Sequence, residues 1–461
     1  MRFLLIAFLL TATTVSAQTR STASVSPPFF GGIPSGTASA TPLQLTILDT
    51  INRALQHNLG VLDAEEAVNR ARGTRWTALG DLLPTIGARV SETRQIFNFA
   101  AFGVNPQQFG FPAVIGPFNL FDGRVAMSQP IVDIHALNSL RAENHNIAAA
   151  QFGVKSARDL VVLVSANLYL QALAGRARLD SVRAQMQTAE AVFQQASNMK
   201  ENGLVAGIDV VRADVQLSTE RQRVTAAQND LEKTKLQLAR VIGLPLGQVF
   251  ELVEDLPYVP VPDMTLDAAL DRAYQSRADY QAALEHVRAA EATRRAIVGE
   301  MMPAIRVNAD YGPLGLTPAD SVNTYALVGA LNVPIFNGRT RGRLAEADAD
   351  LRLRRAEAED LKGSIYYDVK NAFLDLQATA EQLQVATRAR DLASQQLVQA
   401  RDRFTAGVTN NVEVVQAQEA VALASEQYIQ ALYGYNVSKA LLARGLGIAE
   451  EATRQLLGGA R

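Results

Sequence analysis

The chain contains two versions of one short segment, and each version interrupts a long helical pattern. The first reads E-N-G-L-V-A-G-I-D-V-V-R-A-D over 201–214, and the second reads F-T-A-G-V-T-N-N-V-E-V-V-Q-A-Q over 404–418. A shift of 204 residues (407 minus 203) lays Gly203 on Gly407 and Asp209 on Glu413 without a gap. A glycine that ends one helix, a small-residue turn and an acid in the first turn of the next helix predict a tight helical hairpin.

The self-similarity continues beyond these hairpin tips. The shift of 204 also lays Pro130 on Pro334, and further upstream a shift of 219 lays Pro84 on Pro303. Fixed-offset similarity over half a chain indicates that one unit has been duplicated. Although 461 residues could hold two or three ordinary domains, we therefore expect one body made of two pseudo-equivalent halves.

The N-terminal sequence is typical of an exported protein. A short basic segment, an apolar run too short to span a bilayer and small residues at 15–17 predict a cleaved signal peptide at 1–17. An uncleaved membrane anchor is the alternative. The chain has no cysteine, so we expect neither disulfides nor an acylated N-terminal cysteine. Residues 18–42 are rich in Ser, Thr, Ala, Gly and Pro and are interpreted as a flexible arm.

Two pairs of segments alternate apolar with polar or small residues, as amphipathic strands do. The apolar positions are Ile86, Ala88, Val90, Val125, Met127 and Ile131 in the first pair, and Ile305, Val307, Ala309, Tyr311, Tyr325, Leu327, Leu331 and Val333 in the second. A Phe-, Gly- and Pro-rich loop over about 97–119 separates the first two strands.

Such strands in an exported protein suit a membrane barrel with one face toward lipid and one toward water. Four strands cannot close a barrel, and an open sheet edge is not tolerated in lipid. Several chains must therefore share one barrel. An ordinary surface sheet with one wet face fits the alternation of any single strand equally well.

The helical segments are long. Residues 46–80 have a helical pattern that Pro84 ends, and the stretch from Asp133 to Asn202 has no proline. A heptad seam runs through Val161, Ser165, Leu168, Ala172, Gly175, Leu179, Val182, Met186, Ala189, Phe193 and Ala196, and the shift of 204 repeats it from Ile365 to Ala400. This spacing predicts coiled-coil packing in rods of roughly 100 Å. Arg390 interrupts the second seam and is expected at a rim or facing water.

The expected fold is mainly α with a small β part: duplicated long coiled-coil helical hairpins, and four strands per chain that contribute to a shared β-barrel. The expected boundaries are the signal peptide at 1–17, the arm at 18–42, a first repeat at 43–243 with a β-hairpin at about 84–131 and a tip at 203–208, a connector strap at 244–262, a second repeat at 263–448 with a β-hairpin at about 303–335 and a tip at 407–411, and a C-terminal tail at 449–461.

Composition and motifs argue against two other classes of protein. The net charge is −2 and neither half is strongly basic, which removes an electrostatic case for nucleic-acid binding. The four histidines have no metal-ligand spacing, and no phosphate-binding glycine loop or nucleophile elbow occurs. We therefore expect no enzyme activity, no metal and no cofactor.

In combination, the signal peptide, the duplicated helix-hairpin-helix units, the tip G-L-V-A-G-I-D-V-V and the paired prolines resemble the TolC family of outer-membrane efflux proteins. The resemblance covers about 45–448. It implies a homotrimer with a twelve-stranded barrel in the outer membrane of a Gram-negative cell and a long helical tunnel in the periplasm. It also implies an exit duct for efflux or type I secretion, integral and not lipid-anchored. The tip would open like an iris when an inner-membrane transporter of the RND, ABC or MFS type and a periplasmic adaptor dock.

At the hairpin tips, some residues match the family pattern and others depart from it. It implies that Glu413 belongs to an inward ring of acids at the tunnel mouth, and Gln416 stands where a second acid is expected. Asp209 matches an acid of the first tip that helps to hold the mouth shut. Its usual partners are missing, because Phe404 replaces a tyrosine and Thr409 an arginine, so the closing network must differ here. The residues expected to form the turns and dock the adaptor are Gly203, Leu204, Val205, Gly207, Gly407 and Val408.

A soluble periplasmic coiled-coil adaptor that bridges membrane components is the alternative from another class. It explains the helical hairpins and the secretion signal. It does not explain four barrel-type strands with a Phe-rich loop between the first two. An integral barrel would need detergent for extraction, whereas an adaptor without a lipid anchor would wash off in salt or carbonate.

Overall fold

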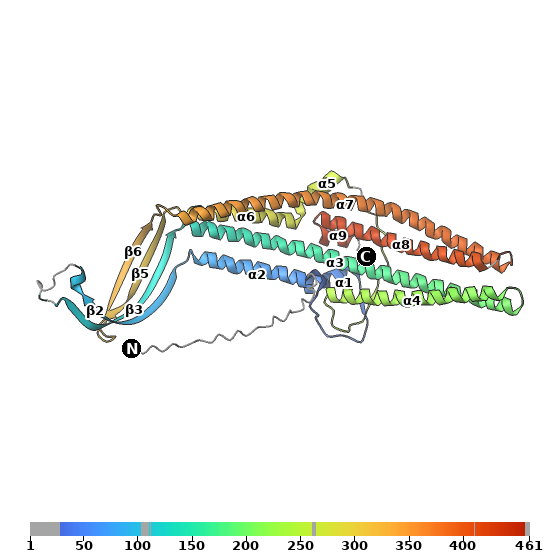
Figure 1. Ribbon diagram of the computed structural model, residues 1–461, viewed down its shortest axis with the longest axis horizontal. Coiled ribbons are helices and arrows are strands. Elements are labelled where there is room, and N and C mark those ends of the chain that lie inside the picture. The colour runs from blue at the N-terminus through green and yellow to red at the C-terminus, as the bar shows by residue number, and fades with distance from the viewer. Residues whose placement is uncertain (1–27, 103–109, 111, 261–263, 410, 457–461) are drawn as a thin grey trace, which may run out of the picture.

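The computed structural model describes residues 28–102, 110, 112–260, 264–409 and 411–456. The expected signal peptide, the first part of the arm, the end of the connector strap and the last part of the tail lie outside the described residues. The molecule is elongated, with strands at one end, long helices along its length and both helical hairpin turns at the other end (Figure 1). The expected mainly helical fold with a small β part is confirmed.

The first half of the chain contains two short helices, a β-hairpin and a long helical hairpin. After a 3-10 turn at Pro28–Phe30, its elements are β1 (Leu43–Leu45), α1 (Ile47–His57), α2 (Leu59–Gly80), β2 (Thr85–Asn98), a 3-10 turn at Phe99–Phe102, β3 (Val114–Val132), α3 (Ile134–Glu201) and α4 (Gly207–Val241). The strand β4 (Phe250–Leu252) follows in the connector and pairs in parallel with β1.

The second half repeats this order. Its elements are α5 (Leu266–Ser276), α6 (Ala278–Gly299), β5 (Ala304–Gly315), β6 (Val322–Asn332), α7 (Gly338–Thr405), α8 (Asn411–Gly445) and the additional helix α9 (Ala449–Leu456). A shift of 219 maps the bounds of α1 and α2 onto those of α5 and α6. A shift of 204 does the same for α3 and α4 onto α7 and α8. The duplication read from the sequence is thus a duplication of the structure.

Equivalent residues cap the two longest helices. Asp133 precedes α3 and its side chain accepts a hydrogen bond from the backbone N–H of Ala136, and Asn337 precedes α7 and accepts from the N–H of Arg339. Both caps satisfy donors that a helix start otherwise leaves unpaired. Each helix then runs for 68 residues without a break.

The helix expected over 46–80 is interrupted at Asn58. The prediction of one continuous helix was therefore wrong. Asn58 has extended backbone angles and is fully buried. Its side-chain oxygen accepts from Gly60 N at 2.9 Å, and its Nδ2 donates to the carbonyl oxygens of Phe29 (2.9 Å) and Val241 (3.3 Å). These tertiary hydrogen bonds break the helix at Asn58, although the helical pattern of the sequence continues across this residue.

The four long strands form one antiparallel sheet in the order β2-β3-β5-β6. Opposite residues lie on one face, and the register places Ile86, Met127, Ala309 and Leu327 in one row across the sheet. The next residue along each strand gives a row of small and polar side chains, Gly87, Ala126, Asp310 and Ala326. The alternation predicted from the sequence is therefore shared by all four strands.

The strands are longer than the pattern predicted. β2 extends to Asn98 and β3 begins at Val114, so the loop expected over about 97–119 is shorter than predicted. The backbone of β3 pairs with that of β2 from Val114, opposite Asn98, to Phe118, opposite Gln95. The two strands therefore extend beyond the residues that alternate clearly between apolar and polar side chains. Most of the remaining loop lies outside the described residues.

The expected coiled-coil seams are buried or half-buried along α3 and α7. Arg390 is an informative exception to the apolar pattern. Its guanidinium lies 3.9 Å from the centroid of the Tyr428 ring on α8, and its side chain is 37% exposed. Stacking on an aromatic ring lets a cation occupy a seam position while it keeps contact with water.

Residues 28–42 are not the free arm that the composition predicted. Phe29 packs against the main hydrophobic cluster, Gly32 pairs with Asn58, and Ser39 N donates to Gln248 Oε1 at 2.7 Å. This segment and residues 244–260 of the connector both lie against the middle of the helical body. There the connector's carbonyl oxygens at Pro257 and Val259 accept hydrogen bonds from α8.

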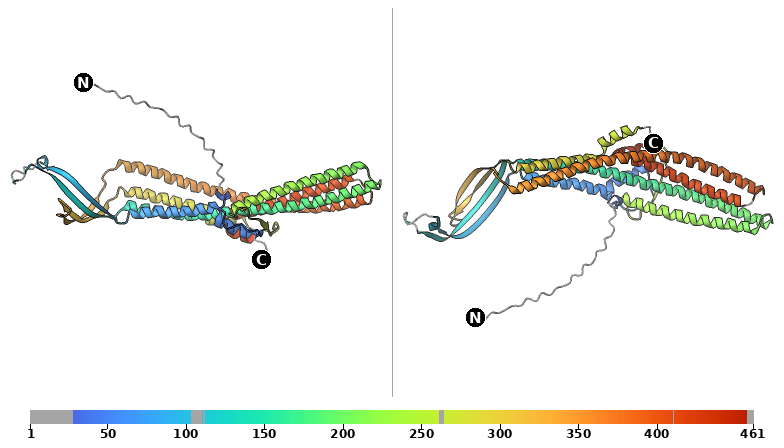
Figure 2. Two further views of the ribbon diagram at one scale, coloured as in Figure 1. Left: turned by 90° about the horizontal axis from the view of Figure 1, so that it is seen from below. Right: turned by 45° about the horizontal axis from the view of Figure 1, so that its top comes forward.

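One window of α3 is apolar and long enough to cross a membrane by composition alone, with 56% of it buried inside the protein. α3 is the central helix of the body and packs against α2, α4, α6 and α8. Its apolar residues are therefore explained by helix packing. The longer helices α2, α3, α4, α6, α7 and α8 lie side by side in a curved layer that continues from the sheet (Figure 2).

Candidate functional site: the two hairpin tips

The first tip is a tight turn that joins α3 to α4. Gly203 has a φ of +73°, a backbone conformation that side chains with a Cβ rarely adopt. Its N–H donates to the Lys200 carbonyl at 2.9 Å, and the N–H of Leu204 donates to the Met199 carbonyl at 2.8 Å. This pair of hydrogen bonds is the Schellman arrangement that closes a helix C-terminus.

The second tip reproduces the same turn 204 residues later. Gly407 has a φ of +71°, its N–H donates to the Phe404 carbonyl at 3.0 Å, and the N–H of Val408 donates to the Arg403 carbonyl at 3.0 Å. The equivalent apolar residues Leu204 and Val408 are each 70% exposed. Gly203, Gly207 and Gly407 are also exposed, whereas Val205 is half-buried.

An apolar cluster joins the two hairpins just behind the turns. It consists of Val192, Ala196 and Ala213 from the first hairpin and Ala400, Phe404, Val414 and Ala417 from the second. Phe404 is only 3% exposed. The position that the family resemblance assigns to a gating tyrosine is therefore occupied here by a buried packing residue.

Glu413 lies in the first turn of α8 and has two partners within its own tip. Thr409 Oγ1 donates to Glu413 Oε2 at 2.5 Å, and Arg403 Nη1 lies 3.6 Å from Glu413 Oε1. The Glu413 side chain is 38% exposed. An acid at a helix start and an arginine at a helix end are each favoured by the helix dipole, so both charges suit their positions.

Asp209 lies in the first turn of α4, and its side chain is 16% exposed. Arg212 Nη1 lies 3.4 Å from its Oδ1, one helical turn further on. The shift of 204 lays Arg212 on Gln416, which is exposed on α8. The two tips therefore compensate their acids differently, the first through Arg212 and the second through Arg403 and Thr409.

Sequence reasoning identified the turns and both acids but missed the two arginines. Arg212 was recognisable from its spacing, because Asp and Arg three residues apart lie on one helix face. Arg403 is ten positions before Glu413, and only the chain reversal at Gly407 brings them together. Among the described residues, no group of three or more His, Cys, Asp or Glu is placed to hold a metal ion.

The histidines serve as structural contacts in the body. His145 Nδ1 lies 2.7 Å from Glu285 Oε2, and His57 Nε2 lies 3.0 Å from Ser35 Oγ. Burial lowers the pKa of His286. None of these residues lies near a hairpin tip.

An amphipathic sheet joined end to end with two long helical hairpins defines a class of outer-membrane channels. The fold matches the outer-membrane channel OprN with a TM-score of 0.74 and 20% sequence identity, over 87% of this chain and 89% of that one.

The sequence model described as "Outer membrane efflux protein" matches residues 50–244 and 269–447, and the chain belongs to this family. It is 23% identical over 423 residues to the pyoverdine export outer membrane protein OpmQ of Pseudomonas putida, covering 89% of this chain and 87% of OpmQ. It is 25% identical over 411 residues to the toluene efflux pump outer membrane protein TtgF of the same species, covering 87% of this chain and 82% of TtgF.

The predicted membership of the TolC family is thus confirmed, and with it an outer-membrane exit duct and not an enzyme. The soluble adaptor considered as an alternative does not fit this family.

Proposed function

We propose that three copies of this chain form one closed cylinder, with a twelve-stranded barrel in the outer membrane and a helical tunnel in the periplasm. The tunnel opens at the hairpin tips when a periplasmic adaptor and an inner-membrane transporter dock. The proposal is based on one observation. A single chain has two open edges, both in its sheet and along its helices.

At the level of the sheet, the open margins are β2 and β6. Among the described helices next to the sheet, α2 packs on α3, α3 on α6 and α6 on α7, which leaves α2 and α7 at the margins. Toward the tips, α4 packs on α3, α3 on α8 and α8 on α7, which leaves α4 and α7. One margin thus belongs to the first half of the chain throughout, and the other belongs to the second half.

Two different margins on one chain suit a head-to-tail contact, which closes into a ring by rotation. In the membrane the argument is stronger, because unpaired strand edges in lipid cost several kcal/mol for each backbone group. Two chains would give eight strands, and side chains fill the interior of a barrel of that size. Three chains are the smallest ring that leaves room for a duct, in agreement with the family resemblance.

At the tips, we propose that Glu413 of each chain faces the tunnel axis and that Arg403 replaces the arginine expected at position 409. The ion pair would then set the charge of the narrowest ring. Opening would require the hairpins to move apart and would break contacts between neighbouring tips. Asp209 is the candidate for such a contact on the first hairpin.

The exposed turns supply the docking surface for the adaptor. Leu204 and Val408 belong to the two hairpin turns, which lie at the end of the molecule opposite the sheet. Their exposure suits an apolar contact with a partner tip. The names of the relatives, for pyoverdine export and toluene efflux, favour small organic molecules as the cargo of this duct.

Native mass spectrometry of protein extracted in mild detergent tests the proposal. We expect a single species of three chains, and ion conductance when the same sample is added to planar lipid bilayers. A folded monomer inserted in membranes would contradict the proposal.

A further inference from the structure

Each of the four crossings between a helix and a long strand exposes at least one large apolar side chain. The most exposed are Ile335 at 98% and Phe336 at 80%, between β6 and α7. An apolar surface of this kind marks a contact with a partner or with lipid. The exposed residues of the four crossings, here called the junction belt, are Leu83, Ile131, Met301, Met302, Ile335 and Phe336.

The register of the sheet places the four crossings at one level of the molecule. The residue pairs at this end of the sheet are Thr85 with Ser128, Pro130 with Arg306, and Ala304 with Asn332. The junction belt therefore extends across the width of the sheet, where the strands meet the helices (Figure 1).

The junction belt is continuous with the apolar face of the sheet. Leu331 shares the face of Leu327, because side chains at every second residue of a strand point the same way. Beyond the end of β6, the exposed residues Val333 and Ile335 follow at the same spacing. Exposed apolar residues thus continue from the sheet to the start of α7.

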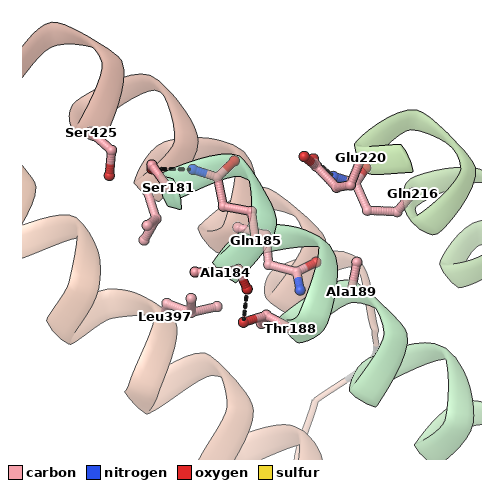
Figure 3. Close-up of a pocket in the computed structure, with 11 residues that line it drawn as sticks. Ser181, Ala184, Gln185, Thr188, Ala189, Gln216, Glu220, Leu397 and Ser425 are labelled. Carbon is pink, nitrogen blue, oxygen red and sulfur yellow. Dashed lines mark hydrogen bonds between the residues drawn. The ribbon is translucent and has the colours of Figure 1, made fainter. Parts of the chain in front are cut away.

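The pocket between the two hairpins differs from this surface. It has a volume of about 190 Å³ and is lined by residues of α3, α4, α7 and α8. Two of its polar groups pair within α3, since Gln185 donates to Ser181 Oγ at 3.2 Å and Thr188 donates to the Ala184 carbonyl at 3.0 Å (Figure 3). An extended partner such as a membrane has access to the junction belt and not to this gap between helices.

Trp76 lies on the helical side of the junction belt. It is the only tryptophan of the chain, it lies one turn before the end of α2 at Gly80, and it is 63% exposed. An indole combines an apolar ring with one N–H donor, and tryptophan is enriched where lipid headgroups meet water. Its position suits the headgroup layer of a membrane.

Two arginines follow the junction belt in the first turn of α7. Arg339 and Arg341 are exposed, and neither forms an ion pair within the described part of the chain, whereas Arg343 contacts Glu300. The first turn of α7 contains no acid. Cations are unfavourable at a helix start, because the helix dipole places partial positive charge there. A bound anion would compensate both charges.

We propose that the junction belt lies in the headgroup layer of the periplasmic leaflet of the outer membrane, where Arg339 and Arg341 bind the phosphate of an anionic phospholipid. A guanidinium forms two parallel hydrogen bonds with phosphate oxygens, and Ile335 and Phe336 lie beside the acyl chains. The inference rests on the proposed placement of the apolar sheet face against lipid. It adds the class of lipid that the channel binds at its periplasmic rim.

The fluorescence of Trp76 tests whether the junction belt meets lipid, because no other tryptophan contributes to the signal. The full-length assembled protein is reconstituted into phosphatidylcholine bilayers with bromine, a contact quencher, either high on the acyl chain or near its end. Bromine high on the chain should quench Trp76 more strongly than bromine near the bilayer centre. No quenching by either lipid, or stronger quenching from the bilayer centre, would overturn the proposal.

A second reporter tests the choice of an anionic lipid. Trp76→Phe combined with Phe336→Trp moves the only tryptophan next to the two arginines. At equal content, brominated phosphatidylglycerol should quench it more strongly than brominated phosphatidylcholine. Arg339→Gln and Arg341→Gln should each lower this preference roughly fivefold. Arg352→Gln, at an exposed position further along α7, should leave it unchanged. Equal quenching by the two lipids before substitution, or an unchanged preference in both arginine variants, would overturn the proposal.

Two further measurements on the same samples separate this inference from the proposed function. Native mass spectrometry counts the chains, and planar bilayers measure conductance. Trimers that conduct ions but show no quenching of Trp76 would overturn the lipid site alone, whereas protein without trimers would contradict the proposed function. Single substitutions at exposed positions seldom change stability, so the arginine variants should assemble as the wild type does.

Discussion

Arg403 and Glu413 face each other across the second hairpin turn, with Nη1 3.6 Å from Oε1. One residue lies in the last turn of α7 and the other in the first turn of α8. The pair explains how a chain with threonine at position 409 keeps an arginine beside its tip acid. Thr409 completes the arrangement through its hydrogen bond to the other carboxylate oxygen.

The first prediction concerns ion selectivity. If Glu413 lines the tunnel mouth, Glu413→Ala should lower selectivity for cations, because a ring of acids attracts cations and repels anions. Arg403→Ala should raise it, because the acid loses its compensating charge. Reversal potentials in planar bilayers measure both effects, with the exposed Arg401→Ala as the control. Unchanged selectivity in both tip variants would remove the pair from the conducting path.

Asp209 is the subject of the second prediction. Asp209→Ala should raise the single-channel conductance of the purified protein modestly, because one contact that holds the hairpins together is lost. Asp214→Ala, an exposed acid of the same helix, should not change it. If Asp209→Ala lowers thermal stability and leaves conductance unchanged, the acid serves only its own helix start and not the gate.

The third prediction uses the register of the sheet. Val307 and Leu327 belong to the apolar face, and Asn308 and Ala326 belong to the opposite face. Val307→Arg or Leu327→Arg should cost roughly 2 to 4 kcal/mol near the membrane midplane and block assembly. Asn308→Arg and Ala326→Arg should be much milder. Equal loss of membrane-inserted protein from the two faces, measured in urea-washed membranes, would contradict a lipid-facing sheet.

The fourth prediction concerns Asp159 in the middle of α3. Burial, opposed by a hydrogen bond from the backbone of Glu450, raises the pKa of its carboxyl to about 6. A raised pKa in the folded state means that ionisation opposes folding, so wild-type stability should fall as the pH rises from about 4 to about 6.

Asp159→Asn keeps an acceptor for the Glu450 N–H and removes the charge. Its stability should match that of the wild type near pH 4 and exceed it by about 1 to 3 kcal/mol at pH 7.5, from the size of the pKa shift. Urea unfolding at several pH values measures the difference. Asp63→Asn, with a side chain 64% exposed in the wild type, serves as the control. An advantage independent of pH would show that the charge of Asp159 is not its cause.

Local patterns were sufficient to predict much of the fold. Gly203 and Gly407 revealed the tips because a positive φ favours glycine, and the alternation around Ile86 and Leu327 revealed the faces of the sheet because side chains alternate along a strand. The shifts of 204 and 219 residues then showed, from the sequence alone, which segments of the two halves are equivalent.

The features that the sequence did not reveal depend on contacts between distant segments. Asn58 breaks a helix through hydrogen bonds to Phe29 and Val241. The residues next to Asn58 in the sequence give no sign of these contacts. Phe404 occupies a position expected at a gate, but packing against the first hairpin buries it. Arg403 reaches Glu413 only because the chain reverses between them.

Crosslinking between the two sheet margins tests the ring of three chains most directly. The chain has no cysteine, so a variant with Ala88→Cys on β2 and Tyr325→Cys on β6 carries one thiol on each margin. These residues share one row of the sheet through Val125 and Tyr311. A flexible thiol crosslinker applied to intact membranes should join chains into a ladder that ends at three, and either single-cysteine variant should give no trimer. A ladder that ends at two, continues beyond three or never forms would contradict the closed trimer.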